Sequence, residues 1–116
     1  MTTVQMLHNP RCSKSRQTLA LLEENGVDVQ VIQYLNTPPT KLELETLLDK
    51  LAISARDLLR KGEDDYKNLN LNNPNMTEEQ LIDAMVSHPK LIERPIVIKG
   101  DKAIIGRPPE TVLDIL

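Results

Sequence analysis

The first third of the chain has two short apolar runs on either side of one helical segment. Residues 4–7 form the first run, and residues 29–34 form the second, which is rich in β-branched residues. Residues 13–24 between them carry leucines at helical spacing. Gly26 follows, and glycine readily adopts the left-handed backbone conformation that often ends a helix. A strand, a helix and a strand of these lengths form a βαβ unit with parallel strands, and this unit constrains the fold most.

The end of the chain predicts a hairpin and a last helix. Residues 95–99 and 102–106 are β-rich runs, and the Gly100-Asp101 pair that joins them is a strong hairpin signal. Pro109 is well placed at the first position of a helix over residues 110–116. Together with the βαβ unit, the hairpin predicts one mixed sheet of four strands.

The middle of the chain predicts only helices. Three of them are expected to begin after hydroxyl residues that can cap a helix, namely Thr40, Ser54 and Thr77. The short helix after Ser54 is expected to run through Arg60 and to end at Gly62. These patterns give an α/β fold in which helices interrupt the sheet-forming segments.

We therefore predict a single domain over residues 1–116. Its order of elements, β-α-β, several helices, then β-β-α, matches a thioredoxin-like core with a four-stranded mixed sheet. Residues 1–39 and 90–116 would form this core, and residues 40–89 would form an inserted helical lobe.

The only cysteine, Cys12, lies between the first predicted strand and the first predicted helix. The first N–H groups of a helix are unpaired and partly positive, so they favour the nucleophilic thiolate and can also receive an anion. Arg11, Lys14 and Arg16 add positive charge. A lone cysteine is often a small buried residue, but this polar loop, with Pro10 before the thiol, favours catalysis.

Composition excludes several other classes of function. Aromatic residues make up only 2% of the chain, and the net charge is −3, so neither base stacking nor a polyanion-binding surface is expected, and nucleic acid is not an expected partner. No apolar run is long enough to span a membrane.

The acidic residues 63–65 lack the spacing of a Ca²⁺ loop, and His88 has no partner at ligand spacing, so no metal site is expected. One cysteine forms no internal disulfide, which favours the reducing cytoplasm.

Several short motifs are spread over nearly the whole chain and together resemble one known family. They are His8-Asn9-Pro10 before Cys12, Ser15-Arg16 after it, Tyr34-Leu35-Asn36-Thr37-Pro38-Pro39, Leu58-Leu59-Arg60-Lys61, Leu81-Ile82-Asp83, Ile92-Glu93-Arg94-Pro95-Ile96-Val97 and Arg107-Pro108-Pro109. Each motif alone is weak, but the combination is specific. It resembles the glutaredoxin-dependent arsenate reductases.

The resemblance implies that Cys12 is the nucleophile and that Arg60, Arg94 and Arg107 hold the oxyanion and the arsenic-bearing intermediates. Arsenate is a tetrahedral dianion at neutral pH, and planar guanidinium groups bind such anions bidentately. Taken singly, each arginine is more often an exposed surface residue. Arg94 and Arg107, however, flank the two arms of the predicted hairpin, which should bring them near one edge beside the Cys12 loop.

Four further residues are implied to support the thiolate. Pro95 matches the proline that thioredoxin-like proteins keep in cis beside the active cysteine, and Arg16 adds charge. His8 would act as a base or hydrogen-bond the loop, and we favour the second role. Ser15 would donate a hydrogen bond to the thiolate or cap the helix through its backbone, and the sequence leaves both open.

The implied activity is reduction of arsenate to arsenite through a Cys12 thiolate–arsenic adduct. Glutathione would be a co-substrate and glutaredoxin a protein partner, with no bound cofactor and no metal, in a cytoplasmic monomer.

One alternative function is a transcription regulator of the Spx type, which shares this fold and binds RNA polymerase. Such regulators often carry a Cys-x-x-Cys switch, which is impossible here because the fourth position is Ser15. Another is a glutathione-linked thiol oxidoreductase acting on a different substrate.

Overall fold

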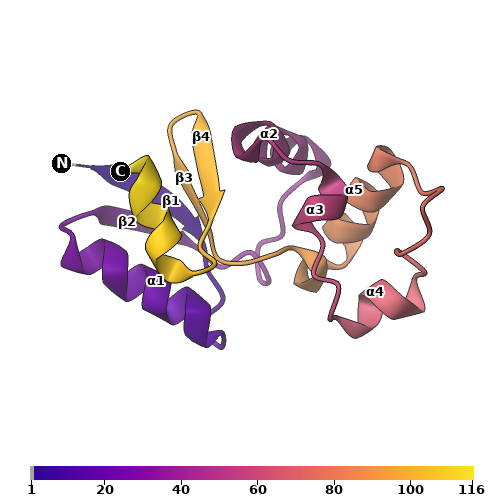
Figure 1. Cartoon of the computed structure of the whole chain (residues 1–116), viewed down its shortest axis with the longest axis horizontal. Coiled ribbons are helices and arrows are strands. Elements are labelled where there is room, and N and C mark those ends of the chain that lie inside the picture. Colours follow the sequence, from indigo (N-terminus) through magenta and orange to yellow (C-terminus); the bar gives the residue numbers. More distant parts are fainter. Residues whose placement is uncertain (1) are drawn as a thin grey trace. The chain divides into compact units, whose positions relative to one another are not determined.

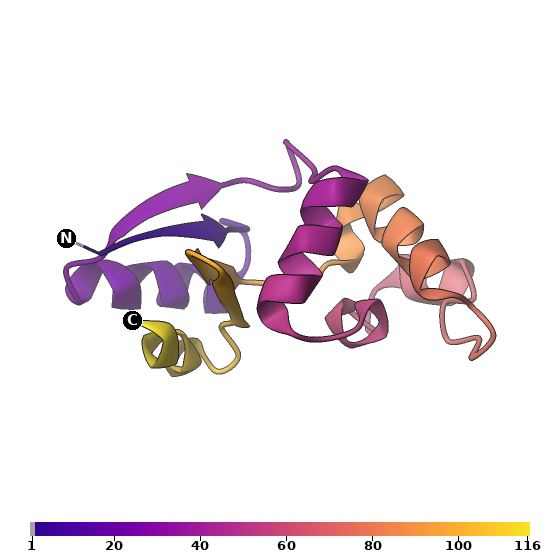
Figure 2. The same ribbon diagram turned by 90° about the horizontal axis from the view of Figure 1, so that it is seen from above.

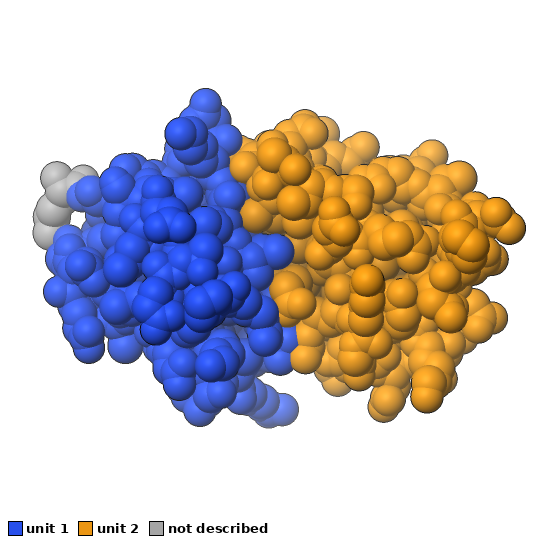
Figure 3. Space-filling model, viewed as in Figure 1, with its two compact units in different colours: residues 1–37, 94–116 blue, residues 38–93 orange. Residues whose placement is uncertain are grey.

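The computed structural model describes residues Thr2–Leu116. The chain divides into two compact units, which Figure 3 shows in different colours. The first unit comprises the chain up to Thr37 together with Arg94–Leu116, and the second comprises Pro38–Glu93. All strands of the sheet lie in the first unit, and the second unit is built from helices.

The first unit holds a mixed four-stranded sheet in the order β2-β1-β3-β4 (Figure 1). Its strands are β1 (Thr3–Leu7), β2 (Asp28–Ile32), β3 (Ile96–Lys99) and β4 (Lys102–Ile105). β1 runs parallel to β2 and antiparallel to β3, which forms the predicted hairpin with β4. The register aligns Leu7 with Ile96 and Ile96 with Ile105. The predicted sheet is confirmed.

Two helices cover the same face of this sheet, as Figure 2 shows from above. They are α1 (Ser13–Glu24) and η2 (Pro109–Ile115). Because the chain has no Phe or Trp, aliphatic side chains and methionine build the core between the helices and the sheet. Its buried residues are Val4, Met6, Leu22, Val27, Val97 and Val112. The bounds of α1 match the prediction, whereas the last helix is a 3₁₀ helix, a form common in short terminal segments.

The second unit contains four short α-helices and one 3₁₀ turn. They are α2 (Lys41–Leu51), α3 (Ala55–Leu58), α4 (Asp64–Asn68), α5 (Glu78–Ser87) and η1 (Pro89–Leu91). Thr40 and Thr77 form complete capping boxes with Glu43 and Gln80, as predicted. Within Thr2–Leu116 no helix has the length and apolar character that crossing a bilayer requires.

The helix after Ser54 ends earlier than predicted. α3 stops at Leu58, and Leu59 instead forms an isolated antiparallel bridge with Ile92. The N–H of Arg60 donates to the carbonyl oxygen of Leu91 at 2.8 Å. The prediction that Arg60 is helical is therefore wrong, because pairing with a segment distant in sequence replaces the local helical hydrogen bonds.

Replacing Ala52 by glycine is expected to stabilise the protein. Ala52 ends α2 with a φ of 57°, a left-handed conformation that costs free energy in any residue with a Cβ atom. Ala52→Gly should raise the free energy of unfolding in urea by roughly 0.5–1 kcal/mol. Gly26 has a φ of 72° and open space around it, so Gly26→Ala should lower the same quantity. A destabilised Ala52→Gly would contradict this account.

Candidate active site

Cys12 is the residue at which the loop after β1 becomes α1. The loop starts beside the sheet, since the N–H of His8 donates to the carbonyl oxygen of Ile32 at 2.9 Å. It closes on itself when the N–H of Cys12 donates to the Asn9 carbonyl oxygen at 3.0 Å. The Cys12 carbonyl then accepts the first helical hydrogen bond, from the N–H of Arg16 at 3.0 Å. The thiol therefore lies half-buried at the N-terminus of α1.

The surroundings of Cys12 favour its thiolate. Burial acts to raise the pKa of the thiol, but the backbone N–H of Ser15 and the charge of Arg94 oppose it. The backbone N–H of Lys14 and the charge of Arg107 act in the same direction, so the pKa of Cys12 is lowered from its ordinary value. The sulfur makes no regular cap hydrogen bond, but these two N–H groups still interact favourably with its negative charge. Sequence reasoning had named Lys14 only for its side chain.

His8 and Ser15 form a buried pair beneath the loop. His8 Nδ1 and Ser15 Oγ are 2.7 Å apart, and Ser15 Oγ also accepts the N–H of Asn9 at 3.1 Å. Burial lowers the pKa of His8, and the charge of Arg16 lowers it further. The imidazole is therefore neutral at neutral pH and holds the loop through a hydrogen bond. The side chain of His8 in the loop faces that of Ser15 in α1, and their functional roles stay predictions.

Two further hydrogen bonds fix the shape of this loop. Arg16 Nη1 donates to the carbonyl oxygen of Pro10 at 2.8 Å, so its side chain reaches back from the first turns of α1. Asn9 Oδ1 accepts the N–H of Arg11 at 3.0 Å. The loop that carries the thiol is thus held by its own side chains as well as by the sheet.

The β3–β4 hairpin brings Arg94 and Arg107 together. Arg107 Nε donates to the carbonyl oxygen of Arg94 at 2.8 Å. The Arg94–Pro95 peptide bond is cis, as the resemblance implied, and so is the bond from Arg107 to Pro108, which the sequence analysis did not predict. Since both guanidinium charges lower the pKa of Cys12, both lie within electrostatic range of the thiol. This end of the first unit combines a thiol of lowered pKa with two cations.

Arg60 belongs to the second unit. Its Nη1 lies 2.7 Å from Glu63 Oε1, and its Nε lies 4.0 Å from Glu93 Oε1. These carboxylates balance its charge within its own unit. The predicted role of Arg60 in holding an oxyanion therefore stays a prediction.

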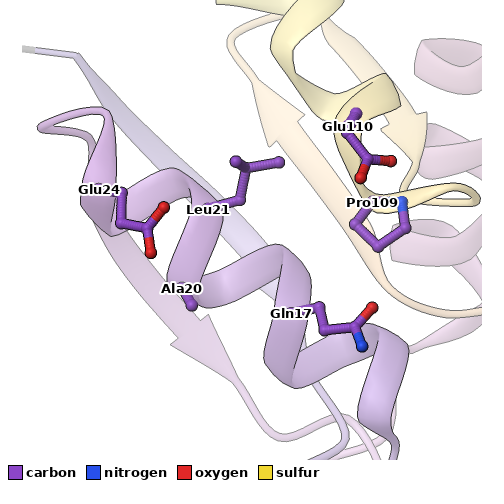
Figure 4. A pocket seen from close by; sticks show the side chains of 6 residues that line it. All are labelled: Gln17, Ala20, Leu21, Glu24, Pro109 and Glu110. Carbon is purple, nitrogen blue, oxygen red and sulfur yellow. The ribbon is translucent and has the colours of Figure 1, made fainter.

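A separate hollow of about 300 Å³ lies between α1 and η2 (Figure 4). Glu24 and Glu110 are among its lining residues, so its charge is unsuited to an anion. None of the predicted site residues lines it. Within the described part of the chain, no group of three His, Cys, Asp or Glu side chains could hold a metal ion.

Comparison with known proteins points to one family. The family model described as ArsC family matches residues 7–115. The chain is 57% identical over 114 residues to "Uncharacterized protein YfgD" of Escherichia coli K12, which covers 97% of this chain and 96% of that protein. It is 47% identical over 117 residues to an arsenate reductase of Neisseria meningitidis, with complete coverage of both. The solved arsenate reductase from Vibrio cholerae superposes with a TM-score of 0.97 at 50% identity, covering 99% of this chain and 98% of that one, which confirms the predicted fold class.

Neutralising either arginine of the hairpin is expected to raise the pKa of Cys12. Arg94→Gln and Arg107→Gln each remove a charge that stabilises the thiolate, so iodoacetamide should alkylate Cys12 more slowly at neutral pH, with its rate profile shifted to higher pH. Arg11→Gln is the matched control, because Arg11 is exposed and is not among the groups that shift this pKa. Identical profiles for all three variants would contradict the electrostatic account.

The neutral His8 should make folding sensitive to mild acid. In the unfolded chain His8 takes a proton near its ordinary pKa of 6.5, whereas in the folded protein its pKa is lower. The stability that depends on His8 is thus fully present above that ordinary pKa and is lost as the pH falls toward the folded value. Urea unfolding at pH 7 and pH 5 should show a larger loss for the wild type than for His8→Gln. Equal losses would show that His8 does not resist protonation.

Proposed function

The chain belongs to the ArsC family, and we propose that it is an arsenate reductase whose nucleophile is the Cys12 thiolate. The observation that carries this proposal is the joint lowering of the Cys12 pKa by the α1 N-terminus and by Arg94 and Arg107. The same partial and full positive charges suit a tetrahedral oxyanion. Relatives named arsenate reductase, aligned over the whole chain, support the choice of arsenate.

In the proposed reaction, arsenate lies against the loop and the guanidinium groups of Arg94 and Arg107. The Cys12 thiolate attacks arsenic, forming an S–As bond, and one arsenate oxygen leaves as water after protonation. The positive surroundings stabilise the thiolate before attack and the oxyanion charge during it. His8, which is neutral, holds the loop in position through Ser15 rather than transferring the proton.

Reduction then requires two thiols from outside the chain, because Cys12 is the only cysteine. Glutathione displaces a second oxygen as water and forms another As–S bond. A glutaredoxin thiol attacks the glutathione sulfur, the electron pair of that bond stays on arsenic, and arsenic(V) becomes arsenic(III). Water then hydrolyses the S–As bond to Cys12, which releases arsenite and restores the thiol.

The remaining predicted residues have supporting roles in this proposal. Arg60, which pairs with Glu63 within the second unit, is the third oxyanion-binding group that the family resemblance implies. Arg16 keeps the loop closed through Pro10, and Pro95 follows Arg94 at the start of the hairpin. We further propose a monomer acting without bound cofactor or metal in the cytoplasm, where glutathione keeps the thiol reduced.

Arsenate turnover by purified protein tests the proposal, with glutathione, glutaredoxin, glutathione reductase and NADPH oxidation as the readout. Cys12→Ser should reduce turnover to background. Arg94→Gln and Arg107→Gln should each lower kcat/KM by about 10²-fold, the scale for removing one preorganised donor. Arg60→Lys should also lower it, because lysine lacks the planar fork, whereas Arg11→Gln should not.

Wild-type turnover no faster than that of Cys12→Ser would refute arsenate reduction. If Cys12 were then still glutathionylated readily, the chain would instead be a glutathione-linked oxidoreductase acting on another substrate. Capture of RNA polymerase by the inactive wild-type protein would point to the regulator of the Spx type.

A further inference from the structure

Gly106 lies at the end of β4, one residue before Arg107, and is very tightly packed. A Cβ atom placed on it would lie 2.9 Å from Pro95 Cγ, 3.0 Å from Thr18 Oγ1 and 3.2 Å from Val112 Cγ1. Carbon atoms normally approach to about 3.5–4.0 Å, so a side chain here forces its neighbours to move. The other three glycines have nothing within 4 Å of such an atom.

The need for glycine at this position is steric rather than conformational. Gly26 and Gly100 have positive φ values, which explains glycine there, but Gly106 does not. Its three close neighbours come from three different parts of the first unit: the residue before β3, the buried face of α1, and η2. The absent side chain therefore allows these parts to meet at one point.

That meeting point is connected to the site by short hydrogen bonds. The N–H of Gly106 donates to the carbonyl oxygen of Pro95 at 2.8 Å. Arg107, the next residue, donates through Nε to the carbonyl oxygen of Arg94 at 2.8 Å. On the side of α1, Thr18 Oγ1 donates to the carbonyl oxygen of Lys14 in the first turn. These bonds link the surroundings of Gly106 to the backbone of both arginines and to the first turn of α1.

We propose that Gly106 is a positioning residue of the oxyanion site, where its lack of a side chain keeps Arg94 and Arg107 beside Cys12. The proposal rests on the function proposed above, because it assigns Gly106 to the same anion site. Gly106 does not touch the reacting atoms. It acts by letting the end of β4 lie directly against Pro95 and α1.

Gly106→Ala is the test. Its kcat/KM for arsenate should fall on the order of tenfold or more, mainly through a higher KM, since displacements below 1 Å in a positioned site have effects of this scale. The alkylation profile of Cys12 should shift to higher pH as the two charges move away. Gly62→Ala is the matched control, because an added methyl group there meets nothing and its φ is not positive, so both readouts should be unchanged.

Val112→Ala separates positioning from stability. It removes buried core volume while leaving Gly106 intact, so it should lower the melting temperature without shifting the alkylation profile. A Gly106→Ala variant that loses stability but keeps the wild-type profile and KM would overturn the proposal. If Gly106→Ala does not fold, Gly106→Ala/Val112→Ala replaces it, since the loss of the Val112 methyl groups removes one of the three close contacts and leaves space on the side of η2. A double variant that also fails to fold would overturn the proposal, because the glycine would then serve folding alone.

The alkylation readout needs no arsenate. If the wild type proved not to reduce arsenate, the function would fail while the effect of Gly106 on the thiolate could still be judged. A wild type that reduces arsenate, with a Gly106→Ala variant indistinguishable from it, would instead remove only the positioning role.

Discussion

The alignment of three strands at one end of the sheet is the constraint on which the site depends. Leu7, Ile96 and Ile105 lie side by side, one on each of β1, β3 and β4. Because β1 and β3 are antiparallel, the last residue of β1 lies beside the first residue of β3. The hairpin then places the last residue of β4 beside the first residue of β3 as well. The Cys12 loop, Arg94 and Arg107 therefore all lie at this end of the sheet, although more than 80 positions in the sequence separate Cys12 from Arg94. A register shift of one residue would reverse the faces of these strands and disperse the site.

The state of the Cys12 thiol is decided by a competition between burial and charge. Burial alone would keep the thiol protonated, as in an inert core cysteine. Here backbone N–H groups and two guanidinium groups outweigh it. The half-buried position matters for this balance, because full exposure would let water and salt screen the charges, whereas full burial would block the substrate. The site thus needs both the cap position on α1 and the hairpin.

Features with local causes were predictable from the sequence, and features with distant causes were not. The bounds of α1 and the capping boxes at Thr40 and Thr77 follow from neighbouring residues, and so does the turn at Gly100. The early end of α3 does not, because the carbonyl oxygen of Leu58 accepts the N–H of Glu93, and the N–H of Arg60 donates to the carbonyl oxygen of Leu91.

The site shows the same division. Cys12 at a helix N-terminus was evident from the spacing of strand and helix, and the hairpin predicted that Arg94 and Arg107 lie near each other. The hydrogen bond between His8 and Ser15 depends on the path of the loop, which spacing alone does not define. The close packing at Gly106 depends on three segments that meet only in the folded chain. A glycine without a turn signal was the one hint in the sequence.

The first turn of α1 has a charge pattern that suits the anion chemistry proposed for Cys12. α2, α3, α4 and α5 each carry an acidic residue in the first turn, where it interacts favourably with the helix dipole. α1 has none there, and it places Glu23 and Glu24 in its last turn, where the dipole disfavours them. An acid in the first turn would stabilise the helix, but it would also repel the Cys12 thiolate and any oxyanion beside it. Its absence leaves the positive end of α1 to the Cys12 sulfur, which is the arrangement expected if the proposed reactivity of Cys12 matters more than the stability of this helix.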